Sequence, residues 1–463
     1  MSDEFIEETE GVESILSNPK SALWKMSLPL IISLFITSLY NVIDAVWVSG
    51  LGADALAGVG FVTPIFIALV GIGNGLGAGI TSALSKYIGQ RDKIKADNAS
   101  VHSIFIAILS SIIVTIVLIL FLKDILVFIG AGATISYAME YGTIISISSV
   151  LIILSNSLYG VLRSEGDANR TMYAMIASSI LNMILDPIFI YYLGFGVSGA
   201  AIATAISLLF VNALILYWFY IKKNTFLKPF LSNYSFDMDI LRDILKVGFP
   251  ASLELINNAL FAALFSLLLA SVASTDAVAV YSTGWRVVTI ATTPMLAIAT
   301  ALISVIAANY GAKRYDEILV AHRYSMKLAV IFGIIAAIIV YVFAPQIVSI
   351  FSYTGTSTRL NSKLIEFLTC IVLFFPTMGY GASSTYVFQG TGNGLTAMFQ
   401  TVLRETVFTL FFAVLLAIVF NLGEYGAWWG IILGELVVNT ITMVWADWHI
   451  KKLIKNNDLL ENE

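Results

Sequence analysis

The sequence predicts an all-α integral membrane protein, with twelve transmembrane helices in two parallel six-helix repeats around a central cavity. Three observations support this fold class. Of the 463 residues, 58% are hydrophobic and only 12% are charged, a balance that soluble globular domains do not have. Apolar runs of about 20 to 30 residues recur along the chain, and about 20 helical residues cross the hydrocarbon core of a bilayer. The two halves of the chain also resemble each other.

Twelve apolar runs form the predicted spans, six in each half. We expect an N-lobe over residues 22–221 and a C-lobe over residues 242–450, joined by a cytoplasmic linker, 222–241, and flanked by cytoplasmic tails, 1–21 and 451–463. The spans are predicted at about residues 26–48, 58–84, 99–122, 136–160, 171–192, 199–221, 243–270, 277–305, 318–343, 364–388, 396–420 and 427–449.

The basic residues predict the orientation, because cytoplasmic loops retain Lys and Arg. Of the 25 Lys and Arg residues, only Lys123, Arg359 and Lys363 fall on the outer side, and Arg286 and Arg404 fall within spans. The other 20 lie on the side that holds both termini. The acidic start of the chain lacks the basic-then-apolar pattern of a signal peptide, so we expect the first span to be retained. We therefore expect a multi-pass protein of the cell membrane with both termini in the cytoplasm.

Similar segments recur in the two halves of the chain. Because each half has six spans, both halves enter the membrane in the same sense, and the repeat is parallel with its pseudo-twofold axis along the membrane normal. The matching pairs are residues 52–58 with 274–280 and 87–93 with 309–315, each 222 positions apart, together with 162–172 and 388–398 and the prolines Pro29 and Pro250.

Two aspartates, Asp44 and Asp186, lie inside apolar runs with no basic residue nearby in the sequence. An isolated ionised carboxylate at the bilayer centre costs at least about 2.5–3.5 kcal/mol, so an intramembrane acid indicates a proton or cation site. At about 1.5 Å of rise per residue, Asp44 lies about 28 Å from Lys25 and Asp186 about 24 Å from Arg170, in the outer half of one lobe. The alternative is that each aspartate only forms hydrogen bonds within the helix packing.

Each aspartate has a polar residue four positions before it, on the same helix face. Tyr40 precedes Asp44, and Asn182 precedes Asp186. Two carboxylates that approach each other in a medium of low dielectric constant do not both stay ionised without a large cost. We therefore expect the two aspartates to bind a proton or cation together.

Two prolines indicate where these helices bend. Pro187 follows Asp186 and removes the backbone bond to the carbonyl of Met183, and Pro29 interrupts the first span. Our hypothesis is that protonation of the aspartates bends the first span.

The second half carries a different set of charges. Glu254, Glu405 and Glu435 are accompanied by Arg286 and Arg404. Buried acids with available basic partners are often simply paired, so we favour structural or gating ion pairs over a second coupling site.

Other motifs do not indicate catalysis or a cofactor. The chain has no Walker-type GK[ST] sequence and no nucleophile–base constellation, so we expect neither ATP use nor enzyme activity, and no cofactor. Alternating glycines between Gly71 and Gly79 lie in a membrane helix and favour close helix packing. The lone Cys370 and the scattered His102, His322 and His449 have no metal-binding spacing.

Four segments together resemble the multidrug and toxic compound extrusion (MATE) family. They are LYNVIDAVWVSGLGADALAGVG at 39–60, VLRSEGDANRTM at 161–172, NMILDPIFIYYLGFGVSGAAIATAIS at 182–207 and NYGAKRY at 309–315. The resemblance implies a two-lobed, cation-coupled antiporter that exports amphipathic organic cations by alternating access. The major facilitator superfamily also has twelve spans in parallel halves, but GQRDKIKAD after the second span does not match its longer loop pattern.

The DinF-like branch of this family has aspartates in spans one and five, with a Tyr, an Asn and a Thr nearby, as its N-lobe cation or proton site. The resemblance carries this role to Tyr40, Asp44, Asn182, Asp186 and Thr204, with Asn41 and Asn156 as further cavity-lining candidates. The other major branch has acids deep in span ten, where this chain has only Glu366 near the outer entrance, which favours the DinF-like branch.

The coupling ion and the cargo follow from the same set of residues. We expect inward proton flow to drive export, with Na⁺ at Asp44, Asn182, Asp186 and Thr204 as the alternative. We expect small organic cations or amphiphiles as cargo, membrane lipid around a monomer, and no nucleic acid. The alternative function is a flippase for a lipid-linked oligosaccharide or another amphiphilic lipid, which an Arg-rich cavity would favour.

Overall fold

The computed structural model describes residues 9–353 and 360–461, and all regular secondary structure in these ranges is helical. Residues 1–8 of the N-terminal tail, Arg359 of an expected outer loop and the last two residues of the C-terminal tail lie outside the described residues. By its internal contacts the chain forms two compact units. The first contains residues up to Ser17 and Ile32–Leu253, and the second contains Asn18–Ile31 and the chain from Glu254 onward. These units group residues by contact and not by sequence repeat, so they do not test the predicted lobe boundaries at 221 and 242, which stay a prediction.

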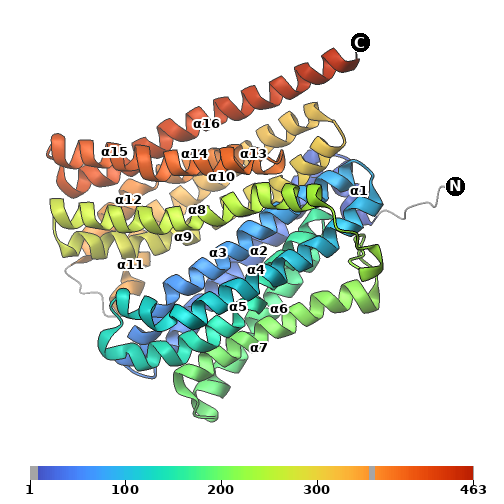
Figure 1. Ribbon diagram of the computed structural model, residues 1–463. Coiled ribbons are helices and arrows are strands. Elements are labelled where there is room, and N and C mark those ends of the chain that lie inside the picture. Colours follow the sequence, from blue (N-terminus) through green and yellow to red (C-terminus); the bar gives the residue numbers. More distant parts are fainter. Residues whose placement is uncertain (1–8, 354–359, 462–463) are drawn as a thin grey trace. The chain divides into compact units, whose positions relative to one another are not determined.

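The first unit holds most of the first six spans (Figure 1). Helix α5 packs against α3, α4 and α7, and α7 also packs against α6. Asp92 and Asp167 start α4 and α6, because each carboxylate accepts a hydrogen bond from a backbone N–H three residues later, both at 2.9 Å. The helices are α1 (Glu10–Leu16), α2 (Pro19–Ser49), α3 (Ala53–Gly89), α4 (Lys93–Phe128), α5 (Ile135–Ser164), α6 (Ala168–Pro187) with the π-helical segment Ile188–Tyr192, and α7 (Gly196–Tyr217) with the π-helical segment Trp218–Lys222.

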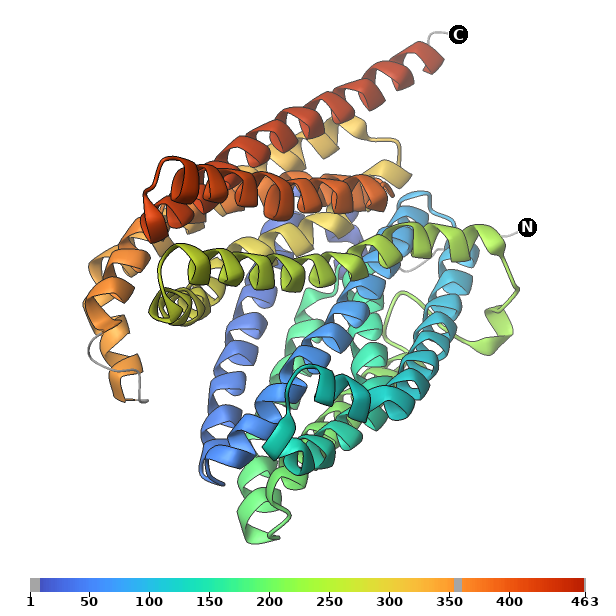
Figure 2. The same cartoon turned by 60° about the vertical axis from the view of Figure 1, so that its left-hand side comes forward.

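The second unit holds most of the other six spans. In it α10 packs against α9 and α13, and α16 packs against α13 and α15 (Figure 2). The helices are α8 (Met238–Val272), α9 (Thr275–Gly311), α10 (Tyr315–Val342), α11 (Ala344–Tyr353), α12 (Asn361–Ile371), α13 (Phe374–Gly390), α14 (Gly394–Val402), α15 (Thr409–Val414) and α16 (Gly423–Glu461), with π-helical segments Leu403–Phe408 and Leu415–Val419 before and after α15.

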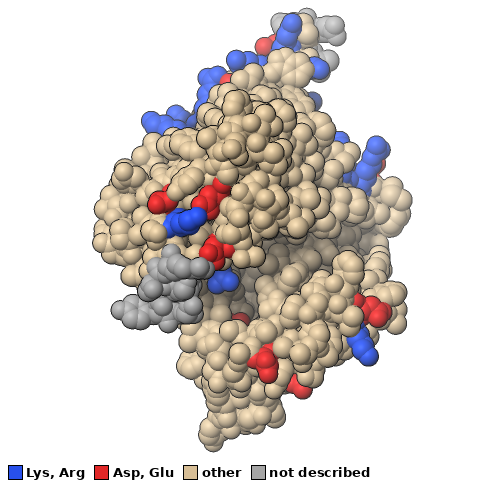
Figure 3. All heavy atoms as spheres, turned by 90° about the vertical axis from the view of Figure 1, so that its left-hand side faces the viewer, with Lys and Arg blue, Asp and Glu red and all other residues tan. Residues whose placement is uncertain are grey.

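Eleven of these helices and helix runs are long and apolar enough to cross a membrane within the described ranges. Helices α12 and α13, bent by 47° at a short break, form a twelfth span when counted together. The exposed side chains agree with a lipid environment, since α4 presents large apolar side chains such as Ile113, Leu120 and Phe121 at 51–67% exposure. The face in Figure 3 is mostly uncharged, with its Lys, Arg, Asp and Glu in small groups. The chain is thus an all-α, multi-pass membrane protein, as predicted.

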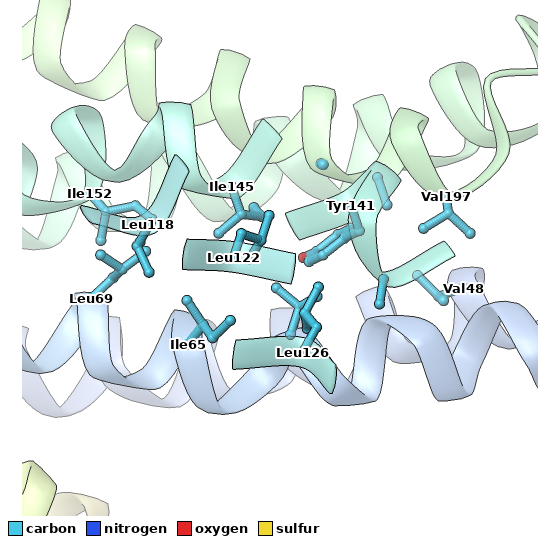
Figure 4. Close-up of a cluster of buried hydrophobic side chains, with 14 of the residues drawn as sticks. Val48, Ile65, Leu69, Leu118, Leu122, Leu126, Tyr141, Ile145, Ile152 and Val197 are labelled. Carbon is cyan, nitrogen blue, oxygen red and sulfur yellow. The ribbon is translucent and has the colours of Figure 1, made fainter. Parts of the chain in front are cut away.

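An apolar core fills the first unit between α2, α3, α4, α5 and α7 (Figure 4). The residues that build it are almost completely buried, and each helix contributes some of them. They include Val48, Ile65, Leu69, Leu118, Leu122, Leu126, Tyr141, Ile145, Ile152 and Val197. This core fixes the rotation of α2 and α5, and therefore which of their polar residues face each other.

The glycines of α3 lie on two different faces of the helix. A Cβ atom added at Gly79 would lie 2.3 Å from the carbonyl oxygen of Ile244 in α8, and Gly75 also faces α8. A Cβ atom added at Gly77 would lie 2.8 Å from the carbonyl oxygen of Asn156 in α5. Both contacts lie inside the first unit. The predicted role of this stripe in close helix packing is confirmed.

The predicted linker is held against the first turns of α4 and the end of α5. Leu227 N–H donates to the Glu165 carboxylate at 2.8 Å, and Lys228 N–H donates to Asp97 at 2.9 Å. Further along, Asp237 N–H donates to His102 Nε2 at 3.1 Å. Segment 224–237 is therefore an ordered strap on the first unit.

Glu165 is 1% exposed and lies between two spans rather than within one. Burial raises the pKa of Glu165 to about 8, and the neighbouring Asp167 also raises it. The backbone N–H groups of Leu227 and Phe226 and the charge of Arg170 act in the opposite direction. Glu165 therefore contacts the strap through a carboxyl group whose charge changes near neutral pH.

Candidate cation site in the first unit

Asp44 on α2 and Asp186 at the end of α6 are brought into direct contact. Their side chains are hydrogen-bonded to each other. Two carboxyl groups in contact away from water repel each other when both are ionised, so this pair is suited to hold a proton or another cation. Asp186 is fully buried and Asp44 is half-buried. The acid pair therefore lies inside the first unit, between two helices of the predicted site.

The three neutral residues of the predicted site surround this pair. The Tyr40 side chain is hydrogen-bonded to Thr204 on α7 and interacts electrostatically with both aspartates. Asn182 Nδ2 donates to Thr204 Oγ1 at 3.3 Å, and Thr204 in turn donates to the carbonyl of Ala200 at 3.1 Å. The structure thus brings all five residues assigned to the coupling site together, from α2, α6 and α7.

Tyr141 on α5 also belongs to this cluster, and the sequence analysis missed it. Its side chain is 7% exposed and interacts electrostatically with Asp44, Tyr40 and Asp186. It also borders the apolar core in Figure 4. Nothing in the local sequence distinguishes Tyr141 from the other aromatic residues of apolar spans, because its contact depends on how α5 is rotated.

The two other candidate cavity residues lie elsewhere. Asn41 is exposed on α2, whereas the neighbouring Tyr40 points toward the aspartates. Asn156 donates to the carbonyl of Ile152 at 2.8 Å and packs against Gly73 at the α3–α5 contact. In the part of the chain that the structure describes, neither asparagine is hydrogen-bonded to Asp44 or Asp186. Their role in lining a cavity stays a prediction.

The two prolines occupy different settings. Pro187 is the last residue of α6, and the chain continues as the π-helical segment Ile188–Tyr192. Such wide turns follow where the regular bond pattern is interrupted, and they are frequent at functional sites. Pro29 lies within α2, which is helical from Pro19 to Ser49. The residues near Pro29 group with the second unit up to Ile31, and those from Ile32 onward group with the first.

The second unit contains a buried network of acids around one arginine. Arg404 is paired with Glu405 at 2.9 Å and lies 3.7 Å from a carboxylate oxygen of Glu435. Asn257 donates to Glu405 at 3.0 Å, and Glu254 interacts electrostatically with Arg404. The expected pairing is therefore present at Arg404.

Other contacts complete this network. Gln389 donates to Glu254 at 3.1 Å, and Asn439 donates to Glu435 at 2.8 Å. Arg286, the second basic partner considered, is exposed on α9 and takes part in none of these contacts. One guanidinium thus faces three carboxyl groups, of which Glu435 is buried and Glu254 and Glu405 are half-buried.

Comparison with known proteins identifies the family. The chain matches the MatE family over residues 29–188 and 250–420. It is 27% identical over 431 residues to the multidrug export protein MepA of Staphylococcus saprophyticus, covering 92% of this chain and 94% of that protein.

Solved structures agree with this match. A multidrug resistance MATE family transporter of the MOP superfamily, in an outward-facing conformation, is 34% identical with a TM-score of 0.94 and covers 97% of this chain and 100% of that one. A MATE protein in a bent conformation gives 34% identity and a TM-score of 0.92, covering 97% of this chain and 99% of that one. The chain is therefore a member of the MATE family, a family of transporters and not of enzymes.

Proposed function

We propose that this protein is a secondary active multidrug efflux antiporter that exports amphipathic or cationic organic compounds in exchange for protons by alternating access. The observation that carries the proposal is the hydrogen-bonded pair of Asp44 and Asp186. The MepA relative supports the cargo class, because its name states multidrug export.

Two contacting acids inside the membrane have the chemistry of a coupling site. With Tyr40, Asn182 and Thr204 as neutral partners, the charge of the site depends on whether a proton or another cation is bound. Na⁺ is the alternative ion, because the same residues offer carboxylate, amide and hydroxyl oxygens to a hard cation. One elementary charge crossing about 100 mV supplies about 2.3 kcal/mol, which sustains a concentration ratio of about fiftyfold.

The proposed cycle uses the interrupted helices. Proton binding at Asp44 and Asp186 from outside bends α2 near Pro29, narrows the N-lobe cavity and expels the cargo. Release of the proton toward the cytoplasm resets the helix. A MATE relative has been observed in a bent conformation, which supports a helix that changes shape. In this proposal the protein works as a monomer in the cell membrane, with both termini in the cytoplasm.

The test is transport in sealed liposomes. An amphipathic fluorescent cation is followed under an imposed proton gradient and then under a sodium gradient, with wild type, Asp44→Asn and Asp186→Asn. We expect proton-driven transport in the wild type and its loss in both variants. Asp54→Asn is the matched control, since Asp54 is an exposed aspartate in the first turn of α3. Gradient-driven transport at the wild-type rate in both variants would overturn the proposed site, and gradient-independent movement of the probe would favour lipid flipping.

A further inference from the structure

A second contact joins the two helices of the aspartate pair, one turn beyond the pair. Trp47 lies three residues after Asp44 on α2, and Tyr191 lies five residues after Asp186 in the π-helical segment Ile188–Tyr192. The Tyr191 hydroxyl donates a hydrogen bond to the backbone carbonyl of Trp47. The two rings also pack edge to face, with centroids 6.2 Å apart and an interplanar angle of 67°. We call this contact between Tyr191 and Trp47 the outer tie.

The outer tie satisfies a backbone group at the end of α2. The last four carbonyls of a helix lack regular intrahelical partners, and the Trp47 carbonyl is one of them, because α2 ends at Ser49. It accepts a weak bond from Gly50 N–H at 3.3 Å in addition to the bond from Tyr191. Leu51 N–H and Gly52 N–H bond to the carbonyls of Val48 and Ser49 at 3.0 and 3.2 Å, so the end of α2 is capped by its own loop and, at Trp47, also by a side chain from another helix.

The space for the Tyr191 hydroxyl is provided by a glycine. A Cβ atom added at Gly50 would lie 2.2 Å from the hydroxyl oxygen of Tyr191. Distances below 3.0 Å are essentially never seen for real Cβ atoms, so even an alanine at this position displaces the tyrosine. The absence of a side chain at Gly50 therefore leaves room for the Tyr191 hydroxyl group.

The π-helical segment that carries Tyr191 is held from the other side as well. A Cβ atom added at Gly199 of α7 would lie 2.6 Å from the carbonyl oxygen of Phe189, so the two backbones are in direct contact. Phe195 N–H and Leu193 N–H bond back to Phe189 and Ile188 at 3.0 and 2.8 Å. The segment is thus fixed to α7 by its backbone and to α2 by Tyr191.

We propose that Tyr191 is a positioning residue for ion coupling, acting through the outer tie on the contact between Asp44 and Asp186. This inference rests on the proposed function of that pair. The pair is a contact between α2 and α6, and the outer tie joins the same two helices one turn away. Loss of the tie lets the end of α2 move and disturbs the geometry with which Asp44 and Asp186 hold the coupling ion. In this proposal the π-helical segment after Pro187 serves to place Tyr191 where its hydroxyl group reaches α2.

The test compares Tyr191→Phe, which removes only the hydroxyl oxygen, with Tyr192→Phe, a change at the neighbouring and 86% exposed tyrosine. One hydrogen bond contributes about 0.5–1.5 kcal/mol, so we expect Tyr191→Phe to slow proton-driven transport about three- to tenfold. We also expect the midpoint of its pH dependence to shift, with the KM for the fluorescent cation unchanged. Tyr192→Phe should match the wild type in all three measurements.

A second pair of variants acts on the other end of the tie. Gly50→Ala should reproduce the shifted pH dependence, because its Cβ displaces the Tyr191 hydroxyl. Gly60→Ala is its control, since a Cβ at Gly60 meets nothing within 4 Å. Spin labels at Ser49 and Phe128, in a Cys370→Ser background, should report a broader distance distribution in Tyr191→Phe than in the wild type. Both labelled positions are exposed, and Cys370 is the free cysteine.

The results separate this inference from the proposed function. Wild-type pH dependence and label distances in Tyr191→Phe would overturn the positioning role, while loss of transport in Asp44→Asn and Asp186→Asn would leave the coupling site standing. Full coupled transport in both aspartate variants would overturn the coupling site, and the inference with it. A slower Tyr191→Phe whose pH midpoint is unchanged would mean a structural contact only, and would also overturn the inference.

Discussion

Each unit buries acidic side chains, but the two units neutralise them by different means. In the first unit, Asp44 and Asp186 contact each other, and the groups identified around them are neutral. In the second unit, Arg404 faces Glu405, Glu435 and Glu254. A fixed guanidinium holds its charge at every physiological pH, whereas a proton held by two contacting acids exchanges with the surroundings. The first unit, whose acid pair has no arginine like Arg404 beside it among the groups identified, is therefore the one suited to take up an external cation.

The largest expected effect is a loss of stability when Arg404 is replaced, which would sharpen the comparison of the two units. Arg404→Gln leaves the buried Glu435 and the half-buried Glu254 and Glu405 without their cation, and breaking a buried pair in this way costs about 3–5 kcal/mol. We expect a clearly lower unfolding temperature in detergent. Arg286→Gln, which removes an exposed arginine, should leave the unfolding temperature unchanged. Equal stability of the two variants would mean that Arg404 does not neutralise the acids of the second unit.

A smaller effect distinguishes the acids of the two units. Glu435→Gln removes a carboxylate that faces Arg404 and accepts from Asn439, and we expect a loss of about 1–3 kcal/mol in unfolding free energy. Asp186→Asn replaces one of two contacting acids with a neutral amide that relieves their mutual repulsion, so we expect a change within about 1 kcal/mol together with loss of coupled transport. Thermal unfolding and liposome transport of the same preparations measure both. If Asp186→Asn proved the less stable of the two variants, the contrast between the units would be broken.

The smallest effect concerns Glu165, a buried acid outside the membrane whose identified hydrogen-bond donors are backbone N–H groups. Its pKa in the folded protein is about 8, above the ordinary value of 4.5, so the docked strap binds more protons than the open strap between these pH values. The stability of docking therefore falls as pH rises through this window and levels off above pH 8. We expect opening of the strap near Leu227 to increase about tenfold from pH 6 to pH 7.

Hydrogen exchange of the strap, corrected for intrinsic rates, measures this opening. Glu165→Gln should abolish the pH dependence, because the amide does not titrate. Asp97→Asn, at the acid that receives Lys228 N–H, should retain it. A pH dependence that persists in Glu165→Gln would assign the titration to another group.

The sequence predicted the spans well because hydrophobicity along a helix is a local property. The spacing also placed Tyr40 and Asn182 beside the aspartates, because each lies four residues before one of them on the same helix face, whereas Thr204 was named only from the family resemblance. Tyr141 and Tyr191 were missed, since their contacts depend on the rotation of α5 and on a π-helical turn. The same reason explains why Arg404 rather than Arg286 meets the acids of the second unit.

The linker shows a second limit of local reasoning. The sequence predicted a linker at 222–241 but not what it contacts, and the structure docks it through Glu165, Asp97 and His102. Each of these residues lies far from the linker in sequence, inside or beside a predicted span. The local sequence does not reveal such hydrogen bonds, because they depend on which helix ends the fold brings next to the linker.

The glycine stripe of α3 has a consequence for how this protein can change under selection. Two residues rotate a helix by about 200°, so glycines at every second position remove side chains from opposite sides of α3. Gly77 admits the backbone of α5 and Gly79 admits the backbone of α8. A larger residue at either position would move one neighbour by a few ångströms. Laboratory selection for new exported compounds should therefore accumulate changes elsewhere and leave this stripe untouched.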